Sequence, residues 1–171
     1  MSRSFEDEGL SVSGYLTNAA EPGALEQLVS DVEQVGPIDT MVYNLGAQIG
    51  NRSLEKTSLK TFELGWQIAC FGLFRLAKVL VPLMAARGKG TLLVTSATSA
   101  MRGNAGQHSH AAAMAGRRLL CQTLNAEYAS QGIHVAHIVV DGAVDAPDTL
   151  GKMLGEEAFT ALRNTRGKEH D

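Results

Sequence analysis

The sequence predicts an α/β fold in which a doubly wound parallel sheet is flanked by helices, and three observations support this prediction. Residues 91–94 (TLLV) form a short, continuous apolar run, which is typical of a parallel strand buried on both faces. Residues 96–107 are small and polar, like the loops that leave the carboxyl ends of such strands. Long helical patterns over about 58–87 and 107–131 lie on either side of this segment in the sequence.

The first secondary-structure elements are predicted from the spacing of apolar residues and from the glycine and proline residues that end them. Leu10, Val12 and Leu16 indicate a short strand over 10–16. A helix follows, with apolar residues at three- and four-residue spacing from Leu25 to Val32, and Gly36 and Pro37 end it. The next predicted strand is Ile38–Asn44.

A long helix is predicted to start near Ser58. Nearly all its positions are apolar except for one narrow stripe, made of Lys60, Glu63, Gln67, Arg75 and Lys78. A helix that is apolar round most of its girth must be buried by more than its own sheet. We interpret its second apolar face as a subunit interface; the alternative is packing within its own monomer only.

The second half of the chain contains one more helix and one more strand. The helix over about 107–131 begins with small residues that permit close packing, and residues 133–140 form the last recognisable strand. A turn-rich exit begins at Asp141, and a charged amphipathic tail follows. We expect one domain over residues 1–171.

Composition excludes several classes of function. The chain has 171 residues, 44% hydrophobic residues, a formal net charge of -3 and only 5% aromatic residues, so a nucleic-acid interface is not expected. The longest apolar region, 68–86, is interrupted by charged residues and a proline, which argues against a membrane span. No signal peptide opens the chain, and Cys70 and Cys121 lack any paired spacing. A cytoplasmic protein with reduced thiols is therefore expected.

Residues 89–118 (KGTLLVTSATSAMRGNAGQHSHAAAMAGRR) resemble the active-site segment of the short-chain dehydrogenase/reductase family. Residues 38–47 (IDTMVYNLGA) resemble the strand of that family that ends in N-N-A-G, 66–84 resemble its long interface helix, and 132–142 resemble its next strand. The resemblance spans most of 10–147. It implies a Rossmann-like sheet, oxidoreductase activity with NAD or NADP, and assembly into dimers or tetramers.

The residues that carry chemistry in that family are replaced here. Aligned through GNAGQ, the Ser position falls on Ala97, the Tyr position on His110, the Lys position on Met114 and the helper Asn position on Ala69. The chain resembles an atypical branch in which the Tyr position is also not Tyr. A methionine thioether supplies neither the charge nor the donors of lysine.

The resemblance also implies an incomplete sheet. The chain starts at what corresponds to the third strand of the family, so the first two strands, the last strand and the glycine-rich phosphate loop are missing from the match. The segment GAQIG (46–50) is a weak substitute for that loop, because no third glycine or helix follows directly. Residues 148–171 would be a charged tail or the start of the substrate lid.

The candidate catalytic residues are His110 and Ser96, which lie at or next to the family Tyr and Ser positions. Strand alternation argues against Ser96, because its side chain would point to the opposite face from position 97. The resemblance places candidate cofactor-binding residues at the strand ends: Asn44, Gly46, Ala47, Thr95, Asp141 and Gly142. No metal site is predicted, because His108 and His110 lack further ligands.

Two functional hypotheses follow. The first is a short-chain dehydrogenase/reductase-like protein, by descent an NAD(P)-dependent oxidoreductase, with a degenerate active site in which His110 is the proton donor. The second is a non-catalytic subunit of the same fold that assembles as a homo-oligomer through the helices at about 58–87 and 107–131. The substrate of the first is not identified by the sequence.

Overall fold

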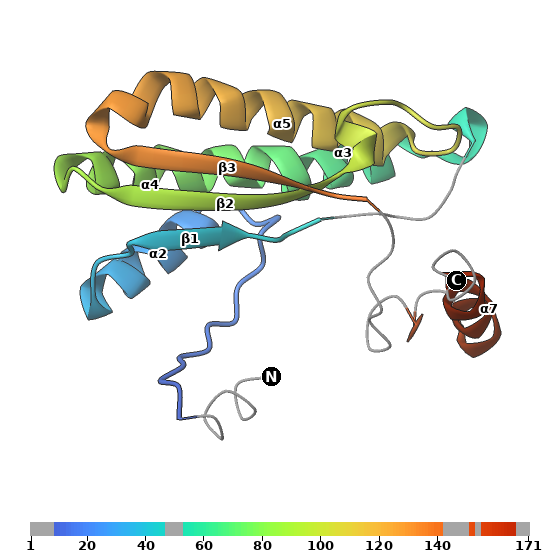
Figure 1. Ribbon diagram of the computed structural model, residues 1–171, viewed down its shortest axis with the longest axis horizontal. Helices are drawn as coiled ribbons and strands as arrows, with labels where there is room; N and C mark the ends of the chain where they lie inside the picture. The colour runs from blue at the N-terminus through green and yellow to red at the C-terminus, as the bar shows by residue number, and fades with distance from the viewer. Residues whose placement is uncertain (1–8, 47–52, 142–150, 153–154, 167–171) are drawn as a thin grey trace. The chain divides into compact units, whose positions relative to one another are not determined.

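The computed structural model describes residues 9–46, 53–141, 151–152 and 155–166 (Figure 1). The chain divides into two compact units, Met1–Val140 and Asp141–Asp171, and each is described by itself. The expectation of a single domain over the whole chain stays a prediction.

The first unit is built on a three-stranded parallel sheet. Its strands are β1 (Thr40–Tyr43), β2 (Gly90–Ala97) and β3 (Ile133–Val140), in the order β1-β2-β3. The register pairs Tyr43 with Val94 and Ser96 with Val139. The predicted parallel sheet is therefore confirmed, and its central strand is β2, which contains the apolar run 91–94.

The strand predicted over 10–16 is wrong. These residues are irregular and largely exposed, and no strand of the described part of the chain pairs with them. Apolar alternation at Leu10, Val12 and Leu16 gave the pattern of a strand, but a strand forms only when its backbone groups find a partner.

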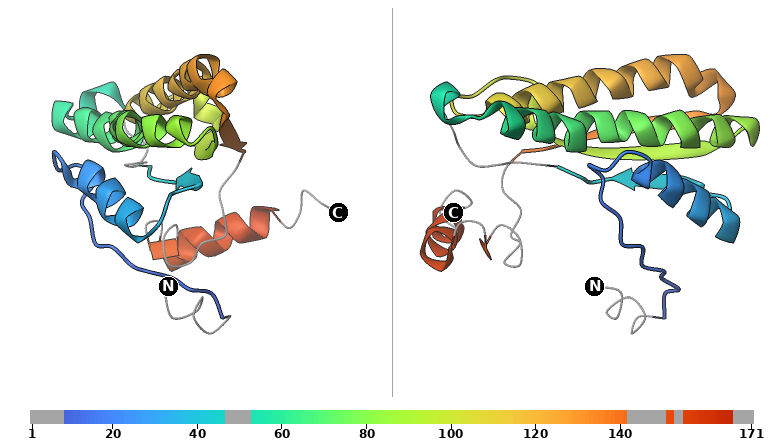
Figure 2. Two further views of the ribbon diagram at one scale, coloured as in Figure 1. Left: turned by 90° about the vertical axis from the view of Figure 1, so that its left-hand side faces the viewer. Right: turned by 180° about the vertical axis from the view of Figure 1, so that it is seen from behind.

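Four α-helices accompany the sheet in the first unit: α2 (Ala24–Val35), α3 (Leu59–Trp66), α4 (Gly72–Ala86) and α5 (His108–Tyr128). Figures 1 and 2 show α4 and α5 side by side along one face of the sheet. Short helical turns join the larger elements: η1 (Leu54–Lys56), η3 (Thr98–Ala100) and η4 (Ala129–Gln131).

The long helix predicted from Ser58 is confirmed, with one interruption. Ser58 caps α3, because its Oγ accepts a hydrogen bond from Thr61 N at 3.1 Å. Between α3 and α4 the chain forms a π-helical turn, η2 (Gln67–Phe71). Such turns re-aim backbone carbonyls and occur often beside functional sites.

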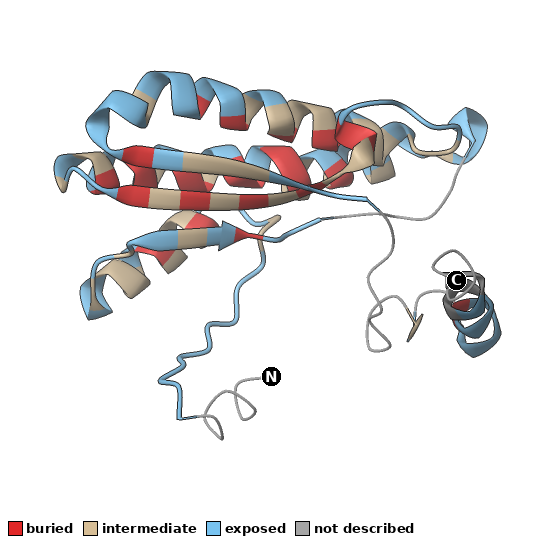
Figure 3. Cartoon of the chain, viewed as in Figure 1, coloured by how far each residue is buried: buried red, intermediate tan, exposed pale blue. Residues whose placement is uncertain are grey.

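The core of the first unit lies between the sheet and its helices, and Figure 3 marks the buried residues of these elements in red. Residues of β2 alternate between buried and half-buried, so that Leu92 and Val94 are fully covered. On the opposite face Val42 and Ile138 are exposed. The helix layer therefore buries one face of the sheet much more completely than the other.

Ion pairs fasten α2 to α4. Arg75 donates hydrogen bonds to both carboxylate oxygens of Glu26, at 2.8 and 2.5 Å, and to the carbonyls of Ala19 and Glu21. This bond lowers the pKa of Glu26. At the other end of the helices, Arg87 reaches Glu33 at 2.8 Å.

The second unit contains α7 (Glu156–Arg166). Phe159 is 7% exposed and packs against Gly151 in the same unit. The prediction that this region is a charged tail or the start of a substrate lid is not tested.

Within the described residues, Leu59–Ala86 is long and apolar enough to cross a membrane by composition, but half of its most apolar window is buried inside the protein.

Candidate functional site

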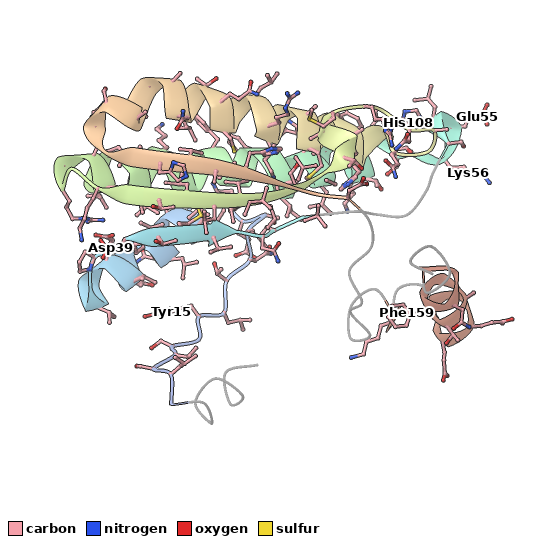
Figure 4. All side chains as sticks on the ribbon, in the orientation of Figure 1. Tyr15, Asp39, Glu55, Lys56, His108 and Phe159 are labelled. Atoms are coloured by element: carbon pink, nitrogen blue, oxygen red, sulfur yellow. The ribbon has the colours of Figure 1, made fainter. Side chains whose placement is uncertain are left out.

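Several predicted site residues within the described part of the chain lie at or directly after the carboxyl ends of the strands. Thr95 and Ser96 are near the end of β2, Asn44 directly follows β1, and Asp141 directly follows β3. Figure 4 labels His108, in the first turn of α5, at the end of the unit opposite Asp39, which precedes β1. Gly46 is exposed, and Ala47 and Gly142 lie outside the described residues.

Three of the four family catalytic positions meet in one apolar cluster. Ala69 and Met114 are almost completely buried, and Ala97 packs against them together with Ala100 and Ala113. These residues come from η2, β2, η3 and α5, which the fold brings together at this edge. The side chains of this cluster are methyl and thioether groups, which do not transfer protons.

Ser96 belongs to the helix-facing side of β2. It is 8% exposed, and its Oγ lies 3.6 Å from Met114 Sδ, a weak acceptor. Its side chain therefore points toward α5, as strand alternation predicts. Ser96 and His110 both lie within the described residues, and no hydrogen bond joins them.

His110 lies in the first turns of α5 and is half-buried. Burial lowers its pKa, and the positive charge of Arg117 lowers it further. Its Nδ1 is enclosed by protein and has no hydrogen-bond partner among the described residues. Both effects favour the neutral form of the imidazole over the charged form.

Asn44 and Thr95 form the polar part of the edge. The Thr95 hydroxyl donates a hydrogen bond to Asn44 Oδ1 at 2.5 Å and lies 3.3 Å from the carbonyl of Tyr43. The pair links the ends of β1 and β2 on the face of the sheet away from α5. Asn44 is exposed, so its amide could also meet a ligand.

Arg117, on α5, is the residue that sequence reasoning missed. Its side chain is 2% exposed, and its guanidinium donates to three main-chain carbonyls: Ala69 at 2.7 Å, Thr95 at 2.6 Å, and Leu45. Its central carbon lies 5.0 Å from the ring centroid of Tyr43. A signal was present: Arg117 follows Met114 by three residues and precedes Cys121 by four, which places it on the buried side of the helix.

Tyr43 completes the buried polar group under the site. Its hydroxyl donates to the carbonyl of Ile68 in η2, and burial raises its pKa to about 12. Cys70 and Cys121 are both free and buried, as predicted, and burial raises the pKa of Cys121 to about 11. Inert thiols in the core are the expected result.

The described part of the site supplies only some of the polar atoms that would bind a dinucleotide cofactor. Asn44 and Thr95 offer polar atoms to such a ligand, but Met114 is turned into the core against Ser96 and offers no hydrogen-bond donor. No group of three or more His, Cys, Asp or Glu side chains gathers as a metal site among the described residues.

Comparison with known proteins identifies the family. A family model described as short chain dehydrogenase matches residues 2–152, so the chain belongs to the short-chain dehydrogenase/reductase family of oxidoreductases. The chain is similar to the 3-oxoacyl-acyl-carrier-protein reductase FabG of Salmonella typhimurium, with 26% identity over 142 residues, 82% of this chain and 57% of that protein. It is also similar to 2-dehydro-3-deoxy-D-gluconate 5-dehydrogenase of Formosa agariphila, with 29% identity over 132 residues.

Solved structures agree with this assignment. A short-chain dehydrogenase from Rhodopseudomonas palustris is 26% identical and superimposes with a TM-score of 0.76, over 80% of this chain and 64% of the other. A gluconate 5-dehydrogenase from Burkholderia cenocepacia, solved with NADP and tartrate, is 23% identical with a TM-score of 0.78 and supports the fold alone. The predicted Rossmann-like fold is thus confirmed. The chain spans about half the length of the curated relatives that it matches.

Proposed function

We propose that this chain is a non-catalytic member of its family that works as an assembly subunit and does not itself transfer hydride. The observation that supports this proposal best is the apolar cluster of Ala69, Ala97 and Met114, with Ser96 turned onto the methionine sulfur. Hydride transfer between a carbonyl and an alcohol needs a group that moves a proton and a donor that steadies the developing charge. This cluster provides neither.

A surface for assembly is available on the long helix. Trp66 and Phe71 stack with ring centroids 5.3 Å apart, and Phe71 and Phe74 stack at 6.3 Å. The exposed fractions of these three residues and of the nearby Phe62 range from 38% for Phe71 to 46% for Phe74. We define Phe62, Trp66, Phe71 and Phe74 as the aromatic patch. An exposed patch of large apolar rings favours an interface, and a second copy of this chain is the occupant that we propose.

The catalytic part of the proposal is tested by hydride transfer and by binding. Purified full-length chain is mixed with NADH or NADPH and a panel of ketones, aldehydes and β-ketoesters, and absorbance at the reduced-cofactor band is followed. No turnover above the buffer blank is expected with either cofactor. Turnover that disappears in His110→Ala and persists in His108→Ala would overturn the proposal, because His108 is exposed and is a matched control.

The assembly part is tested by sedimentation velocity. A dimer or larger species is expected, and Phe74→Asp should convert it to a monomer because a carboxylate would be buried in the interface. The control is Val35→Asp on α2, a residue that is 78% exposed and lies outside the aromatic patch. A wild-type chain that sediments as a monomer at all concentrations would refute the assembly role. The cytoplasm is the compartment that we propose for this assembly.

A second candidate function is favoured by His110. Its neutral imidazole carries an unpartnered buried Nδ1 at the carboxyl edge, where family members hold their proton-transfer residue. The chain would then keep a weak NAD(P)-dependent dehydrogenase activity with His110 as general base. Isothermal titration with NAD and NADP, each alone, separates the two candidates, since heat of binding is expected only for the second.

A further inference from the structure

Arg117 carries a charge into the core, and no carboxylate among the described residues pairs with it. The ion pairs of the described residues involve Arg75, Arg87 and Lys89, and none involves Arg117. Burying an unpaired guanidinium is costly unless its donors are satisfied by good acceptors. Such an arrangement persists only if the surrounding structure depends on it.

The acceptors of Arg117 come from three separate places in the chain. Leu45 follows β1, Thr95 lies near the end of β2, and Ala69 lies in the π-helical turn η2. Each is a main-chain carbonyl, so the bonds fix backbone positions rather than side-chain positions. The planar guanidinium matches three divergent carbonyls in a way that a lysine ammonium does not.

We propose that Arg117 is a positioning residue that locks the carboxyl ends of β1 and β2 and the turn η2 into one rigid edge, with main-chain carbonyls in place of a carboxylate partner. The locked edge carries the Asn44–Thr95 hydrogen bond on its other face. This inference goes beyond the assembly role and does not depend on it.

The same charge acts on His110. The pKa of His110 is lowered first by burial and second by the charge of Arg117. Four other ionisable groups on the neighbouring elements do not contribute to this shift: the exposed Lys60 and Glu63 on α3, Cys70 in η2 and His137 on β3. A ligand at this edge would therefore meet a neutral imidazole beside fixed carbonyls. The π face of Tyr43 adds to the stabilisation of the cation.

The test combines histidine titration by NMR with hydrogen exchange, on the full-length chain. Arg117→Met should raise the titration midpoints of both His110 and His137, since Arg117 lowers the pKa of each. Arg118→Met, the neighbouring control, should raise the midpoint of His137 and leave that of His110 unchanged, because Arg118 acts on His137 only. This difference between adjacent arginines is not expected from a general loss of stability.

Hydrogen exchange reports the lock itself. Amides near the end of β2 should exchange about tenfold faster or more in Arg117→Met, because three charge-assisted hydrogen bonds are lost, and at the wild-type rate in Arg118→Met. Arg117→Lys keeps the charge, so it should retain the His110 midpoint but lose the protection. If Arg117→Met does not fold, Arg117→Lys decides alone: wild-type exchange in that variant would overturn the proposal. Unchanged His110 titration in a folded Arg117→Met variant would overturn it as well.

Discussion

Tyr43 is a buried phenol whose environment makes its ionisation unfavourable. Its hydroxyl bonds to the Ile68 carbonyl, and burial raises its pKa from 10.0 to about 12. A group whose folded pKa is raised stabilises the fold below its unfolded pKa and loses that contribution as pH rises toward the folded value. The contribution of Tyr43 to stability is therefore present at neutral pH, and it is lost only as pH rises from about 10 to about 12.

Tyr43→Phe should lower the free energy of unfolding by about 1–2 kcal/mol at pH 8, because the Ile68 carbonyl loses its donor. The difference between the two proteins should shrink as pH rises from 10 to 12. Urea unfolding at a series of pH values measures this. Tyr128→Phe serves as the control, and a difference for Tyr43→Phe that stays constant over that range would contradict the account.

Gly132 and Gly23 both adopt a backbone conformation with positive φ, but their surroundings differ. Their φ angles are +79° and +82°, in the left-handed region that favours glycine. A Cβ on Gly132 would collide with the Gly88 carbonyl, whereas a Cβ on Gly23 would meet open space. The close approach joins the turn before β3 to the turn before β2.

Gly132→Ala should therefore cost about 3 kcal/mol or more, from strain plus overpacking. Gly23→Ala should cost only about 1 kcal/mol, from strain alone. Thermal or urea unfolding of the two variants beside wild type decides the matter. Equal losses would mean that the contact between Gly88 and Gly132 is looser than the structure indicates.

The π-helical turn η2 is the element on which the site depends most. Two carbonyls of this turn accept side-chain donors from other elements: Ile68 from Tyr43 and Ala69 from Arg117. The turn thus ties the long helix to β1 and to α5. No spacing in the sequence announces it, because the apolar pattern runs on through Leu59–Ala86 without a break.

The packing of α2 on α4 should be sensitive to acid. The hydrogen bond from Arg75 lowers the pKa of Glu26 below 4.5, so this carboxylate stabilises the fold above that pH and ceases to do so as pH falls through its folded pKa. Glu26→Gln should cost about 1 kcal/mol at pH 7. That cost should shrink progressively when unfolding is measured at pH values lowered through the folded pKa of Glu26. Asp39→Asn is the control, because the Asp39–Lys89 pair is mostly exposed.

At the scale of the whole molecule, the secondary-structure elements that depend on local sequence patterns were predicted, whereas contacts that depend on the tertiary fold were missed. Strands β2 and β3 and helices α2 and α5 follow from apolar runs and helical spacing, and each was predicted within a few residues. The strand over 10–16 failed because pairing, not alternation, decides whether a strand exists. Arg117 was missed because its three acceptors are brought together only by the tertiary fold.

Assembly should also change the apparent stability of the molecule. Self-association binds the folded state only, so the Tm of the wild-type chain should rise with protein concentration. In Phe74→Asp the Tm should be independent of concentration, because the aromatic patch no longer pairs. Differential scanning calorimetry over a hundredfold concentration range measures both. A wild-type Tm that does not move would count against the interface.

The packing of Arg117 three residues after Met114 also restricts which residues position 114 can hold. A lysine introduced at position 114 would place a second cation one helical turn from a guanidinium that has no acidic neighbour among the described residues. Repulsion in a medium of low dielectric would oppose it. Met114→Lys should therefore lower the free energy of unfolding for as long as Arg117 stays, so that the residue tolerated at position 114 depends on the residue at position 117.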